Sequence, residues 1–289
     1  MLGSIAQDIR DTMSHGNMVM KLIIVNFLVF IVTALLEAFL PSTYHSHILP
    51  WIALPGDLTV FITRPWTLVT HMFVHGGIWH IAWNMIMLYW FGNITGDLLN
   101  DKRVLPIYFF GGLAGGLLYM ASYQVLPYVG SMAIGASAAV LSVVFAAVLT
   151  APEYRMHLLL LGEVRIKYIG LAILFLDLIG TSATADNSGG HIAHLGGSLF
   201  GLLFVYLLRK GTDLGSVFYK SEPRKAATGR ARLRVAHKSE SILKKQSEAN
   251  EKTTDISKKV DQILEKIKKE GYDSLSDSEK EILYKASKS

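Results

Sequence analysis

Apolar residues gather into long runs through most of the chain and almost disappear from its end. Residues 18–208 hold nearly all of the long apolar runs, whereas residues 209–289 are dense in Lys, Glu, Asp and Ser. A helix needs about 20 apolar residues to cross a hydrocarbon core about 30 Å thick. The pattern therefore predicts a block embedded in a bilayer, followed by a water-soluble tail.

Six runs are long enough to be membrane spans, so the predicted fold class is all-α, a polytopic bundle of six transmembrane helices. The predicted spans cover about 20–40, 79–99, 104–124, 131–150, 166–181 and 189–208. The start of the fifth span is ambiguous because residues 158–161 could extend it. The first run is too long for a signal peptide and no small-residue cleavage site follows it, which favours a retained span.

Basic residues lie mainly on one side of these spans. They precede the first span, follow the sixth from Arg209 onward, or fall in the loops after the second and fourth: Arg10, Lys21, Lys102, Arg103, Arg155, Arg165 and Lys167. The opposite loops contain only Arg64. Because cytoplasmic loops carry the excess of Lys and Arg, both termini are predicted to be cytoplasmic in the cell inner (plasma) membrane. The same pattern accounts for much of the net charge of +5, so no nucleic-acid partner is predicted.

Composition and periodicity divide the chain into four segments. These are a cytoplasmic N-terminal segment (1–19), a six-span membrane domain (20–210), a basic flexible linker (211–250) and a small helical cytoplasmic module (251–289). In the module, four apolar residues follow the i, i+3, i+4, i+7 spacing of one helical face: Val260, Ile263, Leu264 and Ile267. Ser276 and Glu279 fit a capping box at the start of a further helix.

Three interpretations of this C-terminal tail stay open. The basic stretch 224–245 could bind the anionic inner leaflet. The terminal helices could instead dock a cytoplasmic partner, or the whole tail could simply be solvated. The linker fits the solvated interpretation best, whereas the capped apolar pattern of 255–288 favours a small folded module.

The chain contains no cysteine. Disulfides and thiol nucleophiles are thereby excluded, and a structural zinc site would lack its usual soft ligands. No cofactor and no metal are expected.

Four polar residues inside the predicted spans are candidates for chemistry, because polar groups are costly in a bilayer: His80, Asn84, Ser137 and His194. A lone serine in a membrane helix usually bonds back to its own backbone or packs against a neighbouring helix. Ser137, however, follows Gly135 and is surrounded by alanines, so another helix or a substrate backbone could approach it closely.

His194 is followed by Gly197 and Gly201, a stripe of small residues that lets the sixth span press against another helix. If that helix is the fourth span, His194 meets Ser137, and a neutral imidazole can accept the serine proton. His80 and Asn84 are four residues apart on one face. Their N–H groups could stabilise an oxyanion together with the backbone N–H of Ser137, or simply bond to a neighbouring helix.

These residues resemble the motifs of the rhomboid family. Gly-Ala-Ser at 135–137 resembles its Gly-x-Ser signature, Ala193-His194 with Gly197 and Gly201 is similar to its last-helix pattern, and His80-x-x-x-Asn84 looks like its second-helix pair. The resemblance covers residues 20–208 and implies a six-helix bundle with a water-filled cavity. It implies an intramembrane serine endopeptidase, a hydrolase whose partners are transmembrane protein substrates and the lipid bilayer.

The resemblance also implies roles for individual residues. Ser137 would be the nucleophile and His194 the general base, a dyad without a third acidic member. His80 and Asn84 would stabilise the oxyanion, and Gly135, Gly197 and Gly201 would pack the helices around the site.

Three positions depart from the family pattern. Ala138 stands where glycine usually follows the serine, so its methyl group could crowd or narrow the oxyanion site. Leu141 replaces an aromatic residue that stacks on the base, and Trp66-Thr67 replaces a Trp-Arg pair in the first loop. None of these changes removes a reacting group.

Two other functions compete with the protease. A catalytically silent rhomboid-like protein would bind membrane clients without cleaving them, and Ala138 is the feature that favours it. Metal binding or transport would use histidines near the outer side: His45, His47, His71, His75, His80 and His191. His71 and His75 have a spacing that chelates on a helix, but no carboxylate inside the spans is expected to accompany these histidines.

Overall fold

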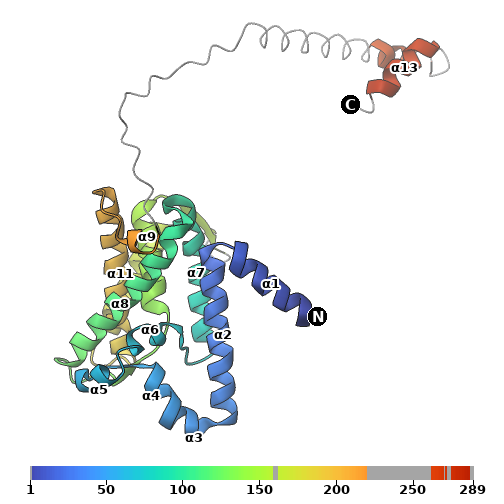
Figure 1. Ribbon diagram of the computed structural model, residues 1–289. Coiled ribbons are helices and arrows are strands. Elements are labelled where there is room, and N and C mark those ends of the chain that lie inside the picture. Colours follow the sequence, from blue (N-terminus) through green and yellow to red (C-terminus); the bar gives the residue numbers. More distant parts are fainter. Residues whose placement is uncertain (1, 159–161, 220–261, 270, 272–274, 287–289) are drawn as a thin grey trace. The chain divides into compact units, whose positions relative to one another are not determined.

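The structure is a computed structural model that describes residues 2–158, 162–219, 262–269, 271 and 275–286, and it is mostly helical (Figure 1). The chain separates into two units, Met1–Glu222 and Pro223–Ser289. The first unit contains the candidate chemistry, and the second contains the short helices of the tail.

Six longer helices dominate the first unit. They are α2 (Met18–Phe39), α7 (Ile78–Leu99), α8 (Val104–Tyr123), α9 (Ser137–Thr150), α10 (Ile166–Gly180) and α11 (Ser188–Arg209). Each lies within or closely matches one of the six apolar runs. Among the described residues, three helical segments are long and apolar enough to cross a membrane: Met18–Phe39, Asp101–Tyr123 and Ser188–Arg209. Ser137–Thr150 is a shorter apolar helix.

Shorter elements join these helices. They are α1 (Leu2–His15), α3 (Pro41–Thr43), the π-helix η1 (Tyr44–Ile48), α4 (Leu49–Ile52), α5 (Leu58–Thr63), α6 (Thr67–Thr70) and the 3₁₀ helices η2 (His71–Phe73), η3 (Asp101–Arg103) and η4 (Leu214–Val217). Two small antiparallel sheets pair β1 (Leu54–Pro55) with β2 (Met132–Ala133), and β3 (Arg155–Leu158) with β4 (Gly162–Arg165).

One predicted boundary is wrong and one open boundary is resolved, and strand pairing is the reason in both cases. The fourth helix begins at Ser137 instead of near residue 131, because Met132 and Ala133 are extended and pair with β1. Leu158 does not extend the fifth helix, because it lies in β3 opposite Gly162. Residues 159–161 lie outside the described part of the chain.

The core of the first unit is centred on α9, which is buried without interruption from Ala138 to Ala147. Glycines on α8 and α11 let these helices approach it. A Cβ atom at Gly197 would overlap the carbonyl oxygen of Ala138, and one at Gly201 would overlap that of Ser142. Such contacts between small residues bring helix backbones together in membranes. The stripe on α11 therefore faces α9.

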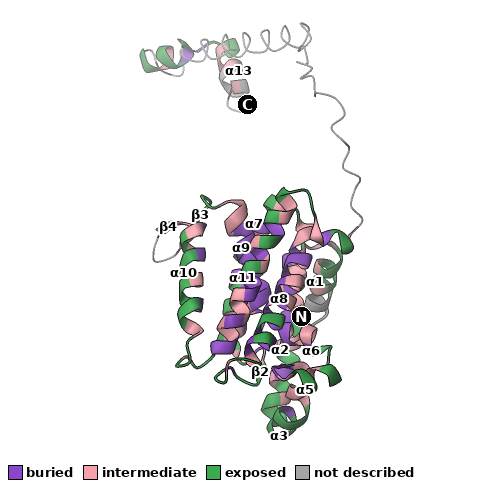
Figure 2. Ribbon diagram, turned by 90° about the vertical axis from the view of Figure 1, so that its left-hand side faces the viewer, coloured by how far each residue is buried: buried purple, intermediate pink, exposed green. Residues whose placement is uncertain are grey.

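Helix α10 is packed much less closely. Only Ile166, Gly170 and Asp177 are buried along it. Figure 2 shows α10 at the edge of the bundle, coloured mainly as exposed and intermediate. Its exposed residues are large and apolar, which suits a surface in contact with lipid: Leu171, Phe175, Leu176, Leu178 and Ile179.

The loop between α2 and α7 has its own packed aromatic pair. The rings of Trp51 and Trp66 stack with centroids 5.8 Å apart, and the Arg64 guanidinium lies 4.5 Å from the centroid of Trp51. Thr67 donates its hydroxyl to the backbone oxygen of Arg64. An arginine thus joins the loop contacts from a position two residues before Trp66.

In the second unit, residues 262–269 are helical and α13 covers Asp277–Ala286. The capping box is present, because the backbone N–H of Ser276 donates to Glu279 Oε2 at 2.8 Å and the backbone N–H of Glu279 donates to Ser276 Oγ at 3.4 Å. Val260 and the predicted linker from residue 220 onward lie outside the described residues.

Candidate active site

Ser137 is the first residue of α9, so its hydroxyl lies at the N-terminus of that helix. The earliest helical hydrogen bond there runs from the backbone N–H of Val140 to the oxygen of Ala136. The N–H groups of Ser137, Ala138 and Ala139 precede it, as the first N–H groups of any helix do. A helix N-terminus with free N–H groups attracts negative charge, so the hydroxyl lies beside donors suited to an oxyanion.

His194 reaches Ser137 across the interface between α9 and α11. Its Nε2 lies 2.6 Å from Ser137 Oγ, a distance at which the hydroxyl donates a hydrogen bond to an unprotonated ring nitrogen. The close approach of α11 to α9 at Gly197, one turn further along, makes this contact geometrically accessible. Serine and imidazole are therefore positioned for proton transfer.

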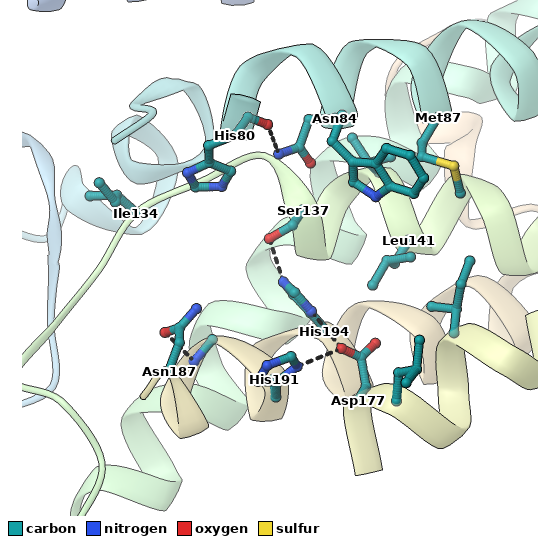
Figure 3. Close-up of a pocket in the computed structure, with 15 residues that line it drawn as sticks. His80, Asn84, Met87, Ile134, Ser137, Leu141, Asp177, Asn187, His191 and His194 are labelled. Carbon is teal, nitrogen blue, oxygen red and sulfur yellow. Dashed lines mark hydrogen bonds and ion pairs between the residues drawn. The ribbon is translucent and has the colours of Figure 1, made fainter. Parts of the chain in front are cut away.

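Asp177 of α10 belongs to the same cluster, so the expectation that no carboxylate in the spans accompanies these histidines is wrong. Its Oδ1 lies 2.7 Å from Nδ1 of His194 and 2.8 Å from Nδ1 of His191 (Figure 3). Asp177 is only 4% exposed. The sequence did contain a signal, because a carboxylate within an apolar run is costly and usually functional. The prediction assigns the run 166–181 as the fifth membrane span and gives its aspartate no role.

His80 and Asn84 of α7 lie across the site from His194, with Ser137 between them (Figure 3). Asn84 Nδ2 donates to the backbone oxygen of His80 at 2.8 Å. An amide nitrogen carries two hydrogens, so one of them stays available to the cavity. His80 Nδ1 faces the backbone N–H of Gly76 at 3.4 Å, and His80 Nε2 is 2.8 Å from where a Cβ of Gly135 would lie.

All of these side chains line one cavity of about 450 Å³ between α7, α9, α10 and α11. The remaining walls are largely apolar: Trp83, Met87, Ile134, Val140, Leu141, Ile173 and Leu176. A few convergent polar groups in an apolar cavity are typical of a binding or catalytic site.

The methyl group of Ala138 lies against α8, on the side away from the cavity. A Cβ at Gly115 would be 2.5 Å from the Ala138 Cβ, and Ala138 is not among the residues that line the cavity. The glycine on α8 thus accommodates the methyl group that departs from the family pattern. Leu141 lines the cavity but carries no ring that could stack on His194.

His71 and His75 do not share a helix, so the predicted i, i+4 chelating pair is not formed. His71 belongs to η2, and its Nδ1–H donates to the backbone oxygen of Thr67, while His75 follows the end of η2. Burial lowers the pKa of each histidine to about 4, with the charge of His80 contributing at His75. Both rings are therefore neutral at physiological pH.

Within the described part of the chain, one cluster has the composition of a metal site: Asp177, His191 and His194, whose ligand atoms lie within 4.8 Å of one another. Two hydrogen bonds to Asp177 Oδ1 already account for this arrangement. Two nitrogens and one oxygen could also hold a divalent ion, but His194 would then lose its contact with Asp177.

Comparison with known families agrees with this geometry. The family model of the Rhomboid domain matches residues 63–211, just over half of the chain, and spans the helices that carry Ser137, Asp177 and His194. A second model, of a family of unknown function (DUF6576), matches residues 246–289. No curated protein matches the chain. The chain is therefore a membrane protein of the rhomboid family, a family of intramembrane serine proteases that also has inactive members.

Proposed function

We propose that the protein is an intramembrane serine endopeptidase that cleaves other membrane proteins in or near their transmembrane segments. The observation that carries this proposal is the 2.6 Å contact between Ser137 Oγ and His194 Nε2 inside the cavity. A serine hydroxyl bonded to an unprotonated imidazole is the usual arrangement of an activated nucleophile.

The reaction is acyl transfer. Ser137 Oγ attacks the carbonyl carbon of the scissile peptide bond while His194 Nε2 takes the hydroxyl proton. The C–N bond then breaks, and His194 returns that proton to the leaving amine. Water attacks the resulting ester with His194 again as base, which releases the carboxylic acid and restores the serine.

The tetrahedral intermediate carries its negative charge on the former carbonyl oxygen. The backbone N–H of Ser137, at the start of α9, is a fixed donor for that charge. The second hydrogen of the Asn84 amide and the ring of His80 line the same cavity on the other side. Removal of one oxyanion donor costs about 10²–10³ in kcat in a serine protease.

The walls of the cavity indicate what kind of substrate it takes. Trp83 of α7 and Leu176 of α10 line it, and each is more than half exposed at the surface of the bundle. An apolar client helix could approach between these helices from the lipid. Its backbone must unwind to present a carbonyl, which small or helix-breaking residues make less costly.

The proposed membrane arrangement has six spans with both termini cytoplasmic in the cell inner (plasma) membrane. It combines the six apolar helices with the basic residues on one side, as the positive-inside rule expects. The segments are the N-terminal segment 1–19, the membrane domain 20–210, the linker 211–250 and the helical module 251–289. The reaction uses no cofactor, and the module could bind a cytoplasmic partner.

A client-binding protein without activity is the alternative, and its support was Ala138. Because the Ala138 methyl lies against Gly115 and away from the cavity, this support is weakened. A protein that only binds its clients would not need the contact between Ser137 Oγ and His194 Nε2.

Labelling with a fluorophosphonate probe, which reacts with activated serines, tests the proposal. Detergent-solubilised wild type, Ser137→Ala and His194→Ala are compared, with a known active rhomboid as the positive control. We expect labelling of the wild type alone. A folded wild type that stays unlabelled while the positive control reacts would instead identify the client-binding alternative.

A further inference from the structure

In the candidate site, one carboxylate oxygen of Asp177 contacts two imidazole rings. Oδ1 of Asp177 lies within 2.8 Å of Nδ1 of both His191 and His194. The other oxygen, Oδ2, is buried and has no hydrogen-bond partner among the described residues. The described contacts of this carboxylate are therefore directed at the two histidines.

Two short contacts at one carboxylate oxygen fit an arrangement in which each ring has its hydrogen on Nδ1. A protonated Oδ1 has one hydrogen and could donate to only one ring, whereas an ionised oxygen accepts from both. Both Nδ1 atoms must then carry hydrogen. A neutral His194 with its hydrogen on Nδ1 has its lone pair on Nε2, where it faces the hydroxyl of Ser137.

We propose that Asp177 is a positioning residue that turns the Ser137–His194 pair into a triad. Its carboxylate holds His194 in the tautomer that can accept the serine proton, and its charge stabilises the imidazolium that forms. His191 keeps the carboxylate oxygen in place through its own N–H. This inference rests on the proposed protease function, and it replaces the two-residue machinery that the sequence predicts.

The position of Asp177 explains why ionisation there is tolerable. An isolated charge in an apolar interior is very costly, but one with two N–H donors within hydrogen-bond distance is stabilised. Replacement of the carboxylate by an amide in a Ser-His-Asp hydrolase lowers kcat by about 10⁴, because the imidazole then takes the wrong tautomer. We expect a loss of at least about 10² in the rate of probe labelling here.

The first experiment measures the rate of fluorophosphonate labelling of wild type and Asp177→Asn in the full chain. Asp97→Asn is the matched control, because Asp97 is an exposed aspartate near the end of α7 and does not line the cavity. We expect labelling of Asp177→Asn to be at least about 10²-fold slower and that of Asp97→Asn to match the wild type. Equal rates for all three, at equal melting temperatures, would overturn the inference.

The second experiment reads the tautomer directly and needs no activity. Ring ¹⁵N chemical shifts of labelled histidines in detergent distinguish a protonated ring nitrogen from an unprotonated one, and His194→Gln assigns the signals. We expect Nδ1–H for His194 in the wild type and loss of that state in Asp177→Asn. A wild-type His194 protonated on Nε2 alone would overturn the inference even if Asp177→Asn failed to fold.

The two experiments separate the inference from the proposed function. A wild type that does not label contradicts the protease, whatever the tautomer of His194 is. A wild type that labels, with His194 protonated on Nε2 alone, contradicts only the role of Asp177.

Discussion

Two regions of the membrane unit are built in opposite ways. Helices α8, α9 and α11 are joined through glycines that leave no room for a side chain, and α9 is buried from Ala138 to Ala147. Helix α10 has only three buried residues and presents large apolar side chains at the edge of the bundle. Small residues thus allow close packing in the core, and large apolar residues form the edge of the bundle.

The residues of the candidate site come from both of these regions. Ser137 and His194 come from α9 and α11 of the rigid region, whereas Asp177 comes from α10. Proton transfer requires a fixed distance, which close backbone packing supplies. A helix with few buried contacts opens at lower free energy, so α10 should be displaced more easily than α9 and α11, which carry Ser137 and His194.

The largest expected difference between the two regions comes from one substitution made in each. In Gly197→Ala the new methyl would overlap the carbonyl oxygen of Ala138. The overlap is with backbone, so it can be relieved only if α9 and α11 move apart. In Gly170→Ala it would meet methyl groups of Val148 at 3.1 Å and 3.3 Å, which can shift. Overpacking of a core costs about 1–3 kcal/mol and occasionally more.

We expect Gly197→Ala to lose more than about 3 kcal/mol, with little folded protein recovered. Gly170→Ala should stay within about 1 kcal/mol of the wild type, because alanine also favours the helix. Gel filtration in detergent and the apparent melting temperature measure both. Equal losses in the two variants would remove the distinction between the regions.

The second comparison removes one phenylalanine from each region. Phe204 of α11 is 1% exposed and Phe175 of α10 is 63% exposed. Phe204→Ala should lower the free energy of unfolding by about 3 kcal/mol, because a cavity is left in packed surroundings. Phe175→Ala should cost less than about 0.5 kcal/mol, because lipid can fill the space. Denaturant unfolding in mixed micelles measures both, and a costly Phe175→Ala would place α10 in the rigid region.

Acid should weaken the rigid region through His71, which packs against Gly116 of α8. Burial lowers the pKa of His71 to about 4, below the value of about 6.5 for an unfolded chain. The unfolded state therefore binds the proton first as pH falls, and stability present above about pH 6.5 is lost toward pH 4.

Between pH 7.5 and pH 5 this single site should cost about 2 kcal/mol. The fall in stability is measured as the difference in melting temperature between the two pH values, separately for each variant. His71→Gln should reduce the fall, whereas His157→Gln, at an exposed position in β3, should keep the wild-type fall. A fall of the same size in His71→Gln would assign the acid sensitivity to other groups.

The smallest expected effect is that of Ala138→Gly. The methyl group that it removes fills space beside Gly115, so stability should drop by about 1 kcal/mol, the cost of a helical glycine. The labelling rate should stay within about threefold of the wild type, because the methyl lies away from the cavity. A tenfold gain in labelling would mean that the methyl narrows the oxyanion site after all.

The sequence predicts the long helices and much of the site because their signals are local or periodic. Apolar runs mark the helices, and the spacing of His194, Gly197 and Gly201 already suggests the meeting of α11 with another helix. Asp177 was missed because its partners come from another helix and no motif includes it. The pairing of Leu54 with Ala133 could not be predicted either, since two-residue strands carry no pattern of their own.

The glycine of the Gly-Ala-Ser motif, Gly135, is required by a residue outside the motif. Its φ is 128°, a backbone conformation that other residues rarely adopt, and a side chain there would come within 2.8 Å of His80 Nε2. A glycine is thus needed at position 135 in part because His80 of α7 occupies the space of a side chain. A database pattern that requires both positions at once should separate chains with this cavity from the many that contain Gly-x-Ser by chance.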